Sequence, residues 1–127
     1  MLRKLRFFTG THTWLALRTP GAYIAERASG RFVAGDFDHD GKDDLAALYE
    51  YNNSAMQIHV MKSSGSAFTK LPSWKIYSAG SYDASRIIGL VTAGDTNGDG
   101  KDDITALYRY NNGLRSPHRF ISTGTSF

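Results

Sequence analysis

The sequence contains no cysteine among its 127 residues. This absence excludes a disulfide framework and a metal site built on thiolates, and it leaves the redox compartment undetermined. No stretch approaches the roughly 18 consecutive apolar residues that a membrane-spanning helix needs, so no membrane span is expected. The first residues, MLRKLRFF, are basic, but Thr9 and Gly10 follow at once, and they do not predict an export signal.

Acidic residues are scarce outside two short segments. Nine of the twelve lie within residues 36–44 and 95–103, which leaves Glu26, Glu50 and Asp83 elsewhere. The formal net charge is +3, and outside the two segments fifteen basic residues stand against three acidic ones, a balance of +12. Such a balance can suit nucleic acid or an acidic glycan. Most of the basic residues are scattered singly, which is typical of a solvated surface, so a nucleic-acid partner is not expected.

The chain consists of two copies of one unit. At an offset of 59, residues 36–68 match residues 95–127 at sixteen of thirty-three positions. Residues 5–11, LRFFTGT, also resemble residues 119–125, RFISTGT, so the chain begins and ends at equivalent points of the repeat. The length and the 41% hydrophobic content fit one soluble globular domain, residues 1–127, built from two repeats of about 60 residues.

The repeat unit is predicted to be all-β. Its first copy contains four short segments typical of strands, and Leu45, Ala47, Tyr49 and Tyr51 are expected on one face of the second of them. Four antiparallel strands in a repeat of this length predict a β-propeller blade. Two blades cannot close a ring that typically needs four to eight, so either several chains form a homo-oligomer or the blades belong to a longer chain. The predicted strands are residues 31–35, 45–51, 56–63 and 74–78.

The two acidic segments have the spacing of a cation site. We call residues 36–44, in GDFDHDGKDD, the first acidic loop, and residues 95–103, in GDTNGDGKDD, the second acidic loop. Carboxylates at positions 1, 3 and 5, with glycine at position 6, would repel one another strongly unless a cation lay between them. Ligands that are all oxygen favour Ca²⁺ over zinc or copper. Position 12 is alanine in both copies, which excludes the bidentate glutamate of an EF-hand, and His39 is predicted to be exposed rather than a ligand.

Both loops and the strands after them resemble FG-GAP or VCBS-type repeats, the calcium-binding blades of integrin α-subunit propellers and of many secreted bacterial proteins. The resemblance implies an extracellular protein that binds two Ca²⁺ per chain. It also implies that Asp43 and Asp102 lie outside the coordination sphere. The replacement of Phe37 by Thr96 is expected to weaken packing without touching a ligand, and with one carboxylate fewer the second loop is expected to bind Ca²⁺ more weakly. The implied ligands are the side chains of Asp36, Asp38, Asp40 and Asp44 with the carbonyl of Lys42, and those of Asp95, Asn97, Asp99 and Asp103 with the carbonyl of Lys101.

Catalysis is not expected. The clustered carboxylates are already assigned to ions, and the sequence has no Ser-His-Asp spacing, nucleophile elbow or phosphate-binding glycine loop. His59 and His118 recur in register, which favours a packing or hydrogen-bonding role for both. The sequence therefore predicts a calcium-stabilised, non-catalytic binding or scaffold module.

Two further functions remain open. One is a carbohydrate-binding lectin formed by self-assembly of two-blade chains, and the other is an accessory domain of a larger secreted hydrolase or toxin. In the lectin, aromatic and arginine side chains would stack on sugar rings; the competing interpretation is that the tryptophans pack between blades. The candidate ligand-binding residues are Trp14, Trp74, Tyr23, Tyr82, Arg27 and Arg86.

Overall fold

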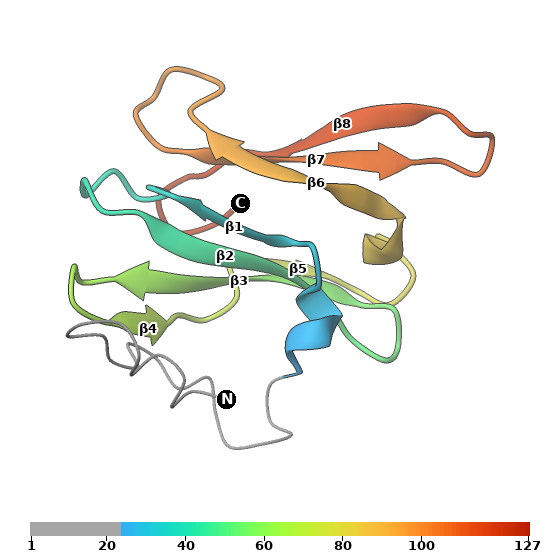
Figure 1. The fold of residues 1–127 in the computed structure, drawn as a ribbon, viewed down its shortest axis with the longest axis horizontal. Helices are drawn as coiled ribbons and strands as arrows, with labels where there is room; N and C mark the ends of the chain where they lie inside the picture. Colours follow the sequence, from blue (N-terminus) through green and yellow to red (C-terminus); the bar gives the residue numbers. More distant parts are fainter. Residues whose placement is uncertain (1–23) are drawn as a thin grey trace, which may run out of the picture.

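The computed structural model describes residues 24–127, and all of its regular structure apart from two short 3-10 turns is antiparallel β-sheet. Figure 1 shows two sheets, one above the other. Among the described residues, no helix is long and apolar enough to cross a membrane. The elements are η2 (Ala25–Ala28), β1 (Phe32–Gly35), β2 (Asp44–Glu50), β3 (Met56–Ser63), β4 (Phe68–Lys70), β5 (Lys75–Tyr77), η3 (Ala84–Arg86), β6 (Ile87–Gly94), β7 (Asp103–Arg109) and β8 (Arg115–Phe120).

The first repeat forms a five-stranded sheet. Its strands follow the order β1-β2-β3-β4, and β5 pairs with the other end of β3. The register of β2 on β3 places Leu48 opposite Ile58 and Ala47 opposite His59. The strands predicted from the sequence are present, and β4 is an additional strand that the sequence analysis did not predict.

The second repeat forms a three-stranded sheet in the order β6-β7-β8. Ala106 lies opposite His118, which repeats the pairing of Ala47 with His59 in the first sheet. A register shift between Ile87 and Val91 marks a bulge in β6. The all-β class and the two blade-like antiparallel sheets are thus confirmed, whereas residues 24–127 form no closed ring and give the second repeat three strands rather than four.

The main core lies between the two sheets. Successive residues of a strand point to opposite faces, so the even-numbered residues of β2 and β3 point toward the second sheet. Phe37 and Trp74 close this core near the acidic loops, where the ring of Phe127 packs against both at centroid distances of 5.4 Å. The buried residues of this core include Ala46, Leu48, Met56, Ile58 and Val60 of the first sheet and Ile87, Ile104, Ala106 and Phe120 of the second.

Both faces of β2 are buried. Ala46 and Leu48 face the second sheet, while Ala47 and Tyr49 belong to a separate cluster on the opposite face with Ala28 and Met61. The placement of Leu45, Ala47 and Tyr49 on one face agrees with the sequence analysis, which made no prediction about the opposite face. Because the strand is covered on both sides, it is apolar at nearly every position rather than at alternate ones.

We predict that Ile58→Ala lowers the free energy of unfolding by about 2–5 kcal/mol, because the side chain is fully buried between the sheets and its removal leaves a cavity. Ile76→Ala is the matched control, since Ile76 is 64% exposed and its truncation should change stability by less than about 0.5 kcal/mol. Urea denaturation followed by tryptophan fluorescence measures both. Equal costs for the two variants would contradict the assignment of Ile58 to the core.

Candidate metal centre

The first acidic loop is folded by hydrogen bonds from its own backbone. It connects β1 to β2, and the two oxygens of Asp36 accept the N–H groups of Asp40 at 3.1 Å and Gly41 at 2.9 Å. The Asp38 carboxylate accepts the Asp40 N–H at 3.2 Å, and that of Asp40 accepts the Lys42 N–H at 2.9 Å. These short-range bonds favour a tight turn over a continued strand. The loop therefore turns its alternate carboxylates into one small volume.

Three carboxylates of this loop form a group that can hold a cation. One oxygen from each of Asp36, Asp38 and Asp40 lies within 4.8 Å of the others. The ammonium of Lys62 on β3 contacts Asp38 Oδ2 and lies 2.6 Å from Asp40 Oδ2. Hydrogen bonds from this ammonium and from the Lys42 N–H lower the pKa of Asp40 to about 2. Asp40 is therefore ionised at neutral pH.

Asp44 brings a fourth carboxylate to the base of the first loop. Its side chain is 1% exposed, and Oδ1 accepts the Ser63 N–H at 2.9 Å. Its other oxygen, Oδ2, is buried and has no hydrogen-bond partner. Burial raises the pKa of this carboxyl group. A buried carboxylate oxygen without a partner is costly unless a bound cation or water satisfies it, so the residues of the first loop fit a hard divalent cation.

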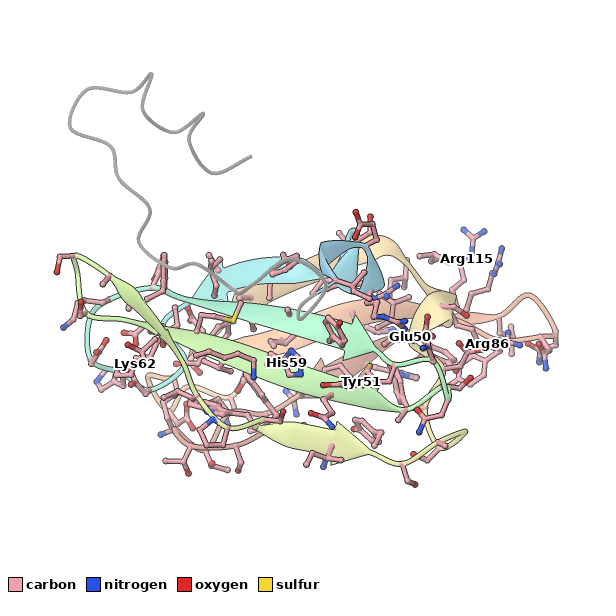
Figure 2. All side chains as sticks on the ribbon, turned by 90° about the horizontal axis from the view of Figure 1, so that it is seen from below. Glu50, Tyr51, His59, Lys62, Arg86 and Arg115 are labelled. Atoms are coloured by element: carbon pink, nitrogen blue, oxygen red, sulfur yellow. The ribbon has the colours of Figure 1, made fainter. Side chains whose placement is uncertain are left out.

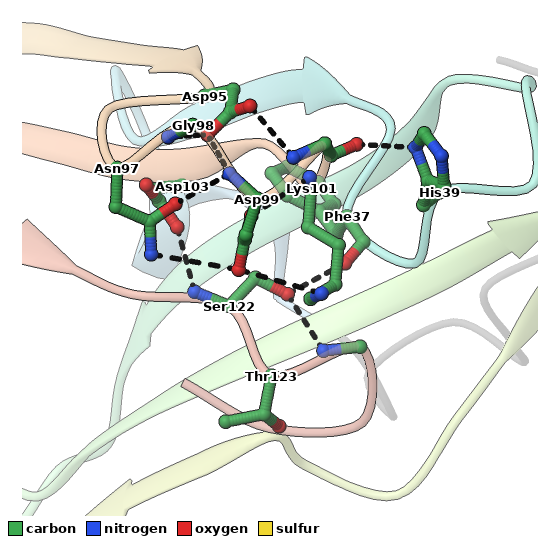
Figure 3. A network of polar contacts seen from close by, with 12 residues as sticks. Phe37, His39, Asp95, Asn97, Gly98, Asp99, Lys101, Asp103, Ser122 and Thr123 are labelled. Carbon is green, nitrogen blue, oxygen red and sulfur yellow. Dashed lines mark hydrogen bonds and ion pairs between the residues drawn. The ribbon is translucent and has the colours of Figure 1, made fainter.

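The second acidic loop repeats the turn with fewer charges (Figure 3). Asp95 accepts the N–H groups of Gly98 and Gly100, each at 2.7 Å, and the Asn97 side chain takes the place of Asp38. Hydrogen bonds from the backbone, that of Gly100 foremost, lower the pKa of Asp95, and the Lys101 N–H does the same for Asp99. The loop keeps the backbone geometry of the first copy but has one carboxylate fewer.

Asp103 differs from its counterpart Asp44 in having partners for both oxygens. Oδ1 accepts the Ser122 N–H at 2.9 Å, and Oδ2 accepts the Thr96 N–H at 3.0 Å and the Thr96 hydroxyl at 2.5 Å. The expectation that Thr96 touches no candidate ligand was therefore wrong. Phe37, the equivalent residue, is fully buried in the core and offers no hydroxyl. The two loops are thus chemically distinct at the same position.

The two loops are bonded directly to each other. The Asp36 N–H donates to Asp102 Oδ2 at 2.9 Å, and the Asp102 N–H donates to the Asp36 carbonyl at 2.8 Å. The Ser122 hydroxyl donates to the Phe37 carbonyl at 2.5 Å. At Gly35, a Cβ would lie 2.9 Å from Ala93 Cβ, so this approach of the two repeats requires glycine. Cross-repeat bonds therefore fix the relative position of the two acidic loops.

His39 takes part in the same contact rather than facing the carboxylates. Its side chain is exposed, and Nδ1 lies 2.5 Å from the carbonyl oxygen of Gly100 in the second loop (Figure 3). Its φ of 66° lies in the left-handed region, where the equivalent residue of the second loop is Gly98. His39 thus bridges the two loops.

The residues proposed for sugar stacking have structural contacts where the structure describes them. Trp74 is 8% exposed and packs against Phe127, and Tyr82 packs against Tyr77 and Tyr108. Trp14 and Tyr23 lie outside the described residues. This placement favours the packing interpretation for Trp74, and Tyr82 packs against the same core.

The two arginines of that set hold the hairpin turns of their repeats. Arg27 donates to the Glu50 carbonyl at 3.2 Å and to the Asn52 side chain. Arg86 makes the equivalent bonds to the Arg109 carbonyl at 3.3 Å and to the side chain of Asn111.

The repeated histidines lie in aromatic clusters. The His59 ring packs against Tyr49 and contacts the Tyr51 hydroxyl at 3.2 Å, and Figure 2 shows His59 and Tyr51 side by side. Burial lowers the pKa of His59 to about 4. His118 contacts the hydroxyls of Tyr82 and Tyr110, each at 2.8 Å. Both histidines are therefore packing and hydrogen-bonding residues, as the sequence analysis favoured.

Sequence reasoning missed Lys62, Asp102 and Ser122. Asp102 and its counterpart Asp43 share position 8 of the loops, but nothing in the pattern indicates that the carboxylate reaches the other repeat. Lys62 could have been found, because the offset of 59 aligns it with Ile121, and a charge present in only one copy is a visible difference. Ser122 recurs as Ser63, which marks it as part of the repeat without revealing its partner.

A family model described as an FG-GAP-like repeat matches residues 36–106, which is 71 of the 127 residues. The match begins at the first residue of the first acidic loop and includes the whole of the second. No curated protein and no solved structure gives a significant match to the chain.

We predict that Asp102→Ala lowers the free energy of unfolding by about 1–3 kcal/mol, because it leaves the Asp36 N–H without its acceptor at the contact between the repeats. Asp43→Ala is the matched control, since this exposed residue occupies the same position in the first loop and should cost less than about 0.5 kcal/mol. Chemical denaturation measures both. An Asp43 variant as unstable as the Asp102 variant would refute the cross-repeat role of Asp102.

Proposed function

Because the chain belongs to the FG-GAP-like repeat family, we propose that it is a calcium-stabilised β-propeller-type module that binds or scaffolds a partner outside the cell and catalyses no reaction. Repeats of this family are typically non-catalytic binding modules and are usually extracellular, which supports both parts of the proposal. The two antiparallel sheets are consistent with propeller blades.

The observation that carries the calcium proposal is the buried Oδ2 of Asp44. This oxygen has no hydrogen-bond partner, and it belongs to the same loop as the Asp36, Asp38 and Asp40 carboxylates. Oxygen donors with several negative charges are the ligands that Ca²⁺ prefers. In our proposal Asp36, Asp38, Asp40, Asp44 and the Lys42 carbonyl hold one ion, and Asp95, Asn97, Asp99, Asp103 and the Lys101 carbonyl hold the other.

The ion would stabilise the fold rather than act as a switch. It would neutralise carboxylates that the turn forces together, and extracellular loops of this kind bind Ca²⁺ at roughly 10⁻⁴ to 10⁻³ M. With free Ca²⁺ near 1 mM, binding then stabilises the fold by about 0.5–1.5 kcal/mol per site. The second loop is the weaker candidate, because it has one carboxylate fewer and Asp103 already accepts hydrogen bonds at both oxygens.

We propose that the structural partner is a neighbouring blade of different sequence rather than a second copy of the chain. Within the described residues β8 pairs only with β7, whereas its counterpart β3 pairs with three strands, so β8 has an edge that a further strand can cover. Several residues that pack the first sheet on the second have polar or imino-acid counterparts on the outer face of the second sheet, although Leu48 keeps a leucine, Leu107. Ala46, Ile58 and Val60 correspond to Thr105, Pro117 and Arg119.

No observation in the described residues favours the lectin or the hydrolase accessory domain over this proposal. The lectin required stacking by Trp74, which is 8% exposed and lies in the core.

Calcium removal tests the proposal. We expect EDTA to lower the melting temperature by several degrees, since 1 kcal/mol corresponds to about 4 °C in a domain of this size. Calorimetric titration should show that Asp40→Ala weakens Ca²⁺ binding at least tenfold, whereas Asp43→Ala, at the position outside the proposed coordination sphere, changes it less than twofold. Equal effects of the two variants would contradict the ligand assignment, and demetallated protein that releases no heat on adding Ca²⁺ would refute the calcium role.

Light scattering tests whether the chain associates with copies of itself. We expect the chain to have its monomer mass of 14.0 kDa in the presence of Ca²⁺, because the outer face of the second sheet carries Arg119 where the first sheet carries Val60. An assembly whose mass is a fixed multiple of this value would instead support a ring of identical chains. Arg119→Val is the informative variant, since restoring the apolar residue should increase self-association.

A further inference from the structure

Lys62 occupies the mouth of the first acidic loop. It extends from β3, and Figure 2 shows it at the opposite end of the sheet from Glu50. Its ammonium contacts Asp38 Oδ2 and lies 2.6 Å from Asp40 Oδ2, while Lys42 reaches the same Asp40 oxygen only at 3.5 Å. The Lys62 side chain is 35% exposed, so it is partly enclosed by the loop that it neutralises. One ammonium therefore bridges two of the carboxylates proposed to bind the ion.

The second repeat lacks both members of this ion pair. At the offset of 59, Lys62 corresponds to Ile121 and Asp38 corresponds to Asn97. Asp99, the counterpart of Asp40, is bonded to the ammonium of Lys101 at 3.4 Å, just as Asp40 is to that of Lys42. The loops thus differ by one carboxylate and by one ammonium that touches it. Counting the four proposed side-chain ligands together with residue 62 or 121, each site carries a charge of −3.

We propose that Lys62 is a tethered counter-cation of the first acidic loop, which holds the loop together without a metal and which Ca²⁺ must displace in order to bind. This inference rests on the proposed function of the loop as a calcium site. The ammonium and the ion need the same oxygens of Asp38 and Asp40, so they compete. Lys62 then determines the calcium affinity of the first loop and reduces the advantage of its additional carboxylate.

Electrostatics predicts that Lys62 stabilises the first loop when no ion is bound and lowers its calcium affinity. Without an ion, the three carboxylates of the triad lie within 4.8 Å of one another, and the ammonium offsets their repulsion. With an ion, the ammonium must leave the two carboxylates and would remain as a nearby like charge. In the ion-free state Lys62 does not satisfy Asp44 Oδ2. Its ammonium donates to Asp38 and Asp40 and leaves this buried oxygen without a partner. The tether therefore neutralises the mouth of the loop but not its base.

Lys62→Met tests the inference in the full chain. To assign the heat to the first loop, the variant is made in an Asp99→Ala background, where the second loop is disabled. We expect titration with CaCl₂ to show an affinity roughly three- to tenfold higher than in the same background with Lys62, because the ion no longer has to displace an ammonium that pairs with two carboxylates. In EDTA the melting temperature of Lys62→Met should fall. Lys70→Met is the matched control and should change the affinity less than twofold, because Lys70 is exposed and lies on the neighbouring strand β4 rather than in the loop.

The reciprocal variant, Ile121→Lys in an Asp40→Ala background, places an ammonium beside the second loop, and it should lower the calcium affinity of that loop. It keeps the inference testable if Lys62→Met fails to fold.

An unchanged or lower affinity of Lys62→Met, in a chain whose first loop does bind Ca²⁺, would overturn the role of Lys62 and leave the proposed function standing. A parent chain that binds no Ca²⁺ at either loop would overturn both.

Discussion

Repulsion between neighbouring carboxylates is the constraint on which the rest of this structure depends. The tight turn after β1 places Asp36, Asp38 and Asp40 within a few ångströms, and the bonds that shape the turn are made by the same carboxylates. Any charge that neutralises them therefore also stabilises the turn and the start of β2. The second loop repeats the geometry with one carboxylate fewer.

The acidic loops also join the two sheets. The Asp36 backbone is bonded to Asp102, the Phe37 carbonyl to Ser122, and the His39 ring to Gly100, so three of the first four residues of the first loop are bonded to the second repeat. Phe37 continues from the loop into the core, where it meets Phe127. A change in the charge of one loop should therefore alter the stability of the interface between the repeats. Electrostatics and packing act on the same few residues.

The fold was largely predictable because the repeat is visible. The offset of 59 and the turn residues located most strands, and the strand at residues 56–63 has the predicted bounds. The burial of both faces of β2 was not predictable, since Ala46 and Ala47 look alike until the position of the second sheet is known. The candidate ligands come from the resemblance to FG-GAP repeats, carried over by position onto the two loops. The partners that distinguish the two loops, Thr96 for Asp103 and Lys62 for Asp38, depend on side-chain directions that spacing alone does not give.

The bond from the Ser122 hydroxyl to the Phe37 carbonyl joins residues 85 positions apart. Contacts of such long sequence separation form late, because the entropy of closing the intervening chain must be lost before they contribute. During synthesis, the first loop can adopt its own turn early, but its backbone acquires this acceptor only after residue 122 has been made. The order of synthesis therefore leaves this contact of the first repeat unformed until most of the second repeat has been made.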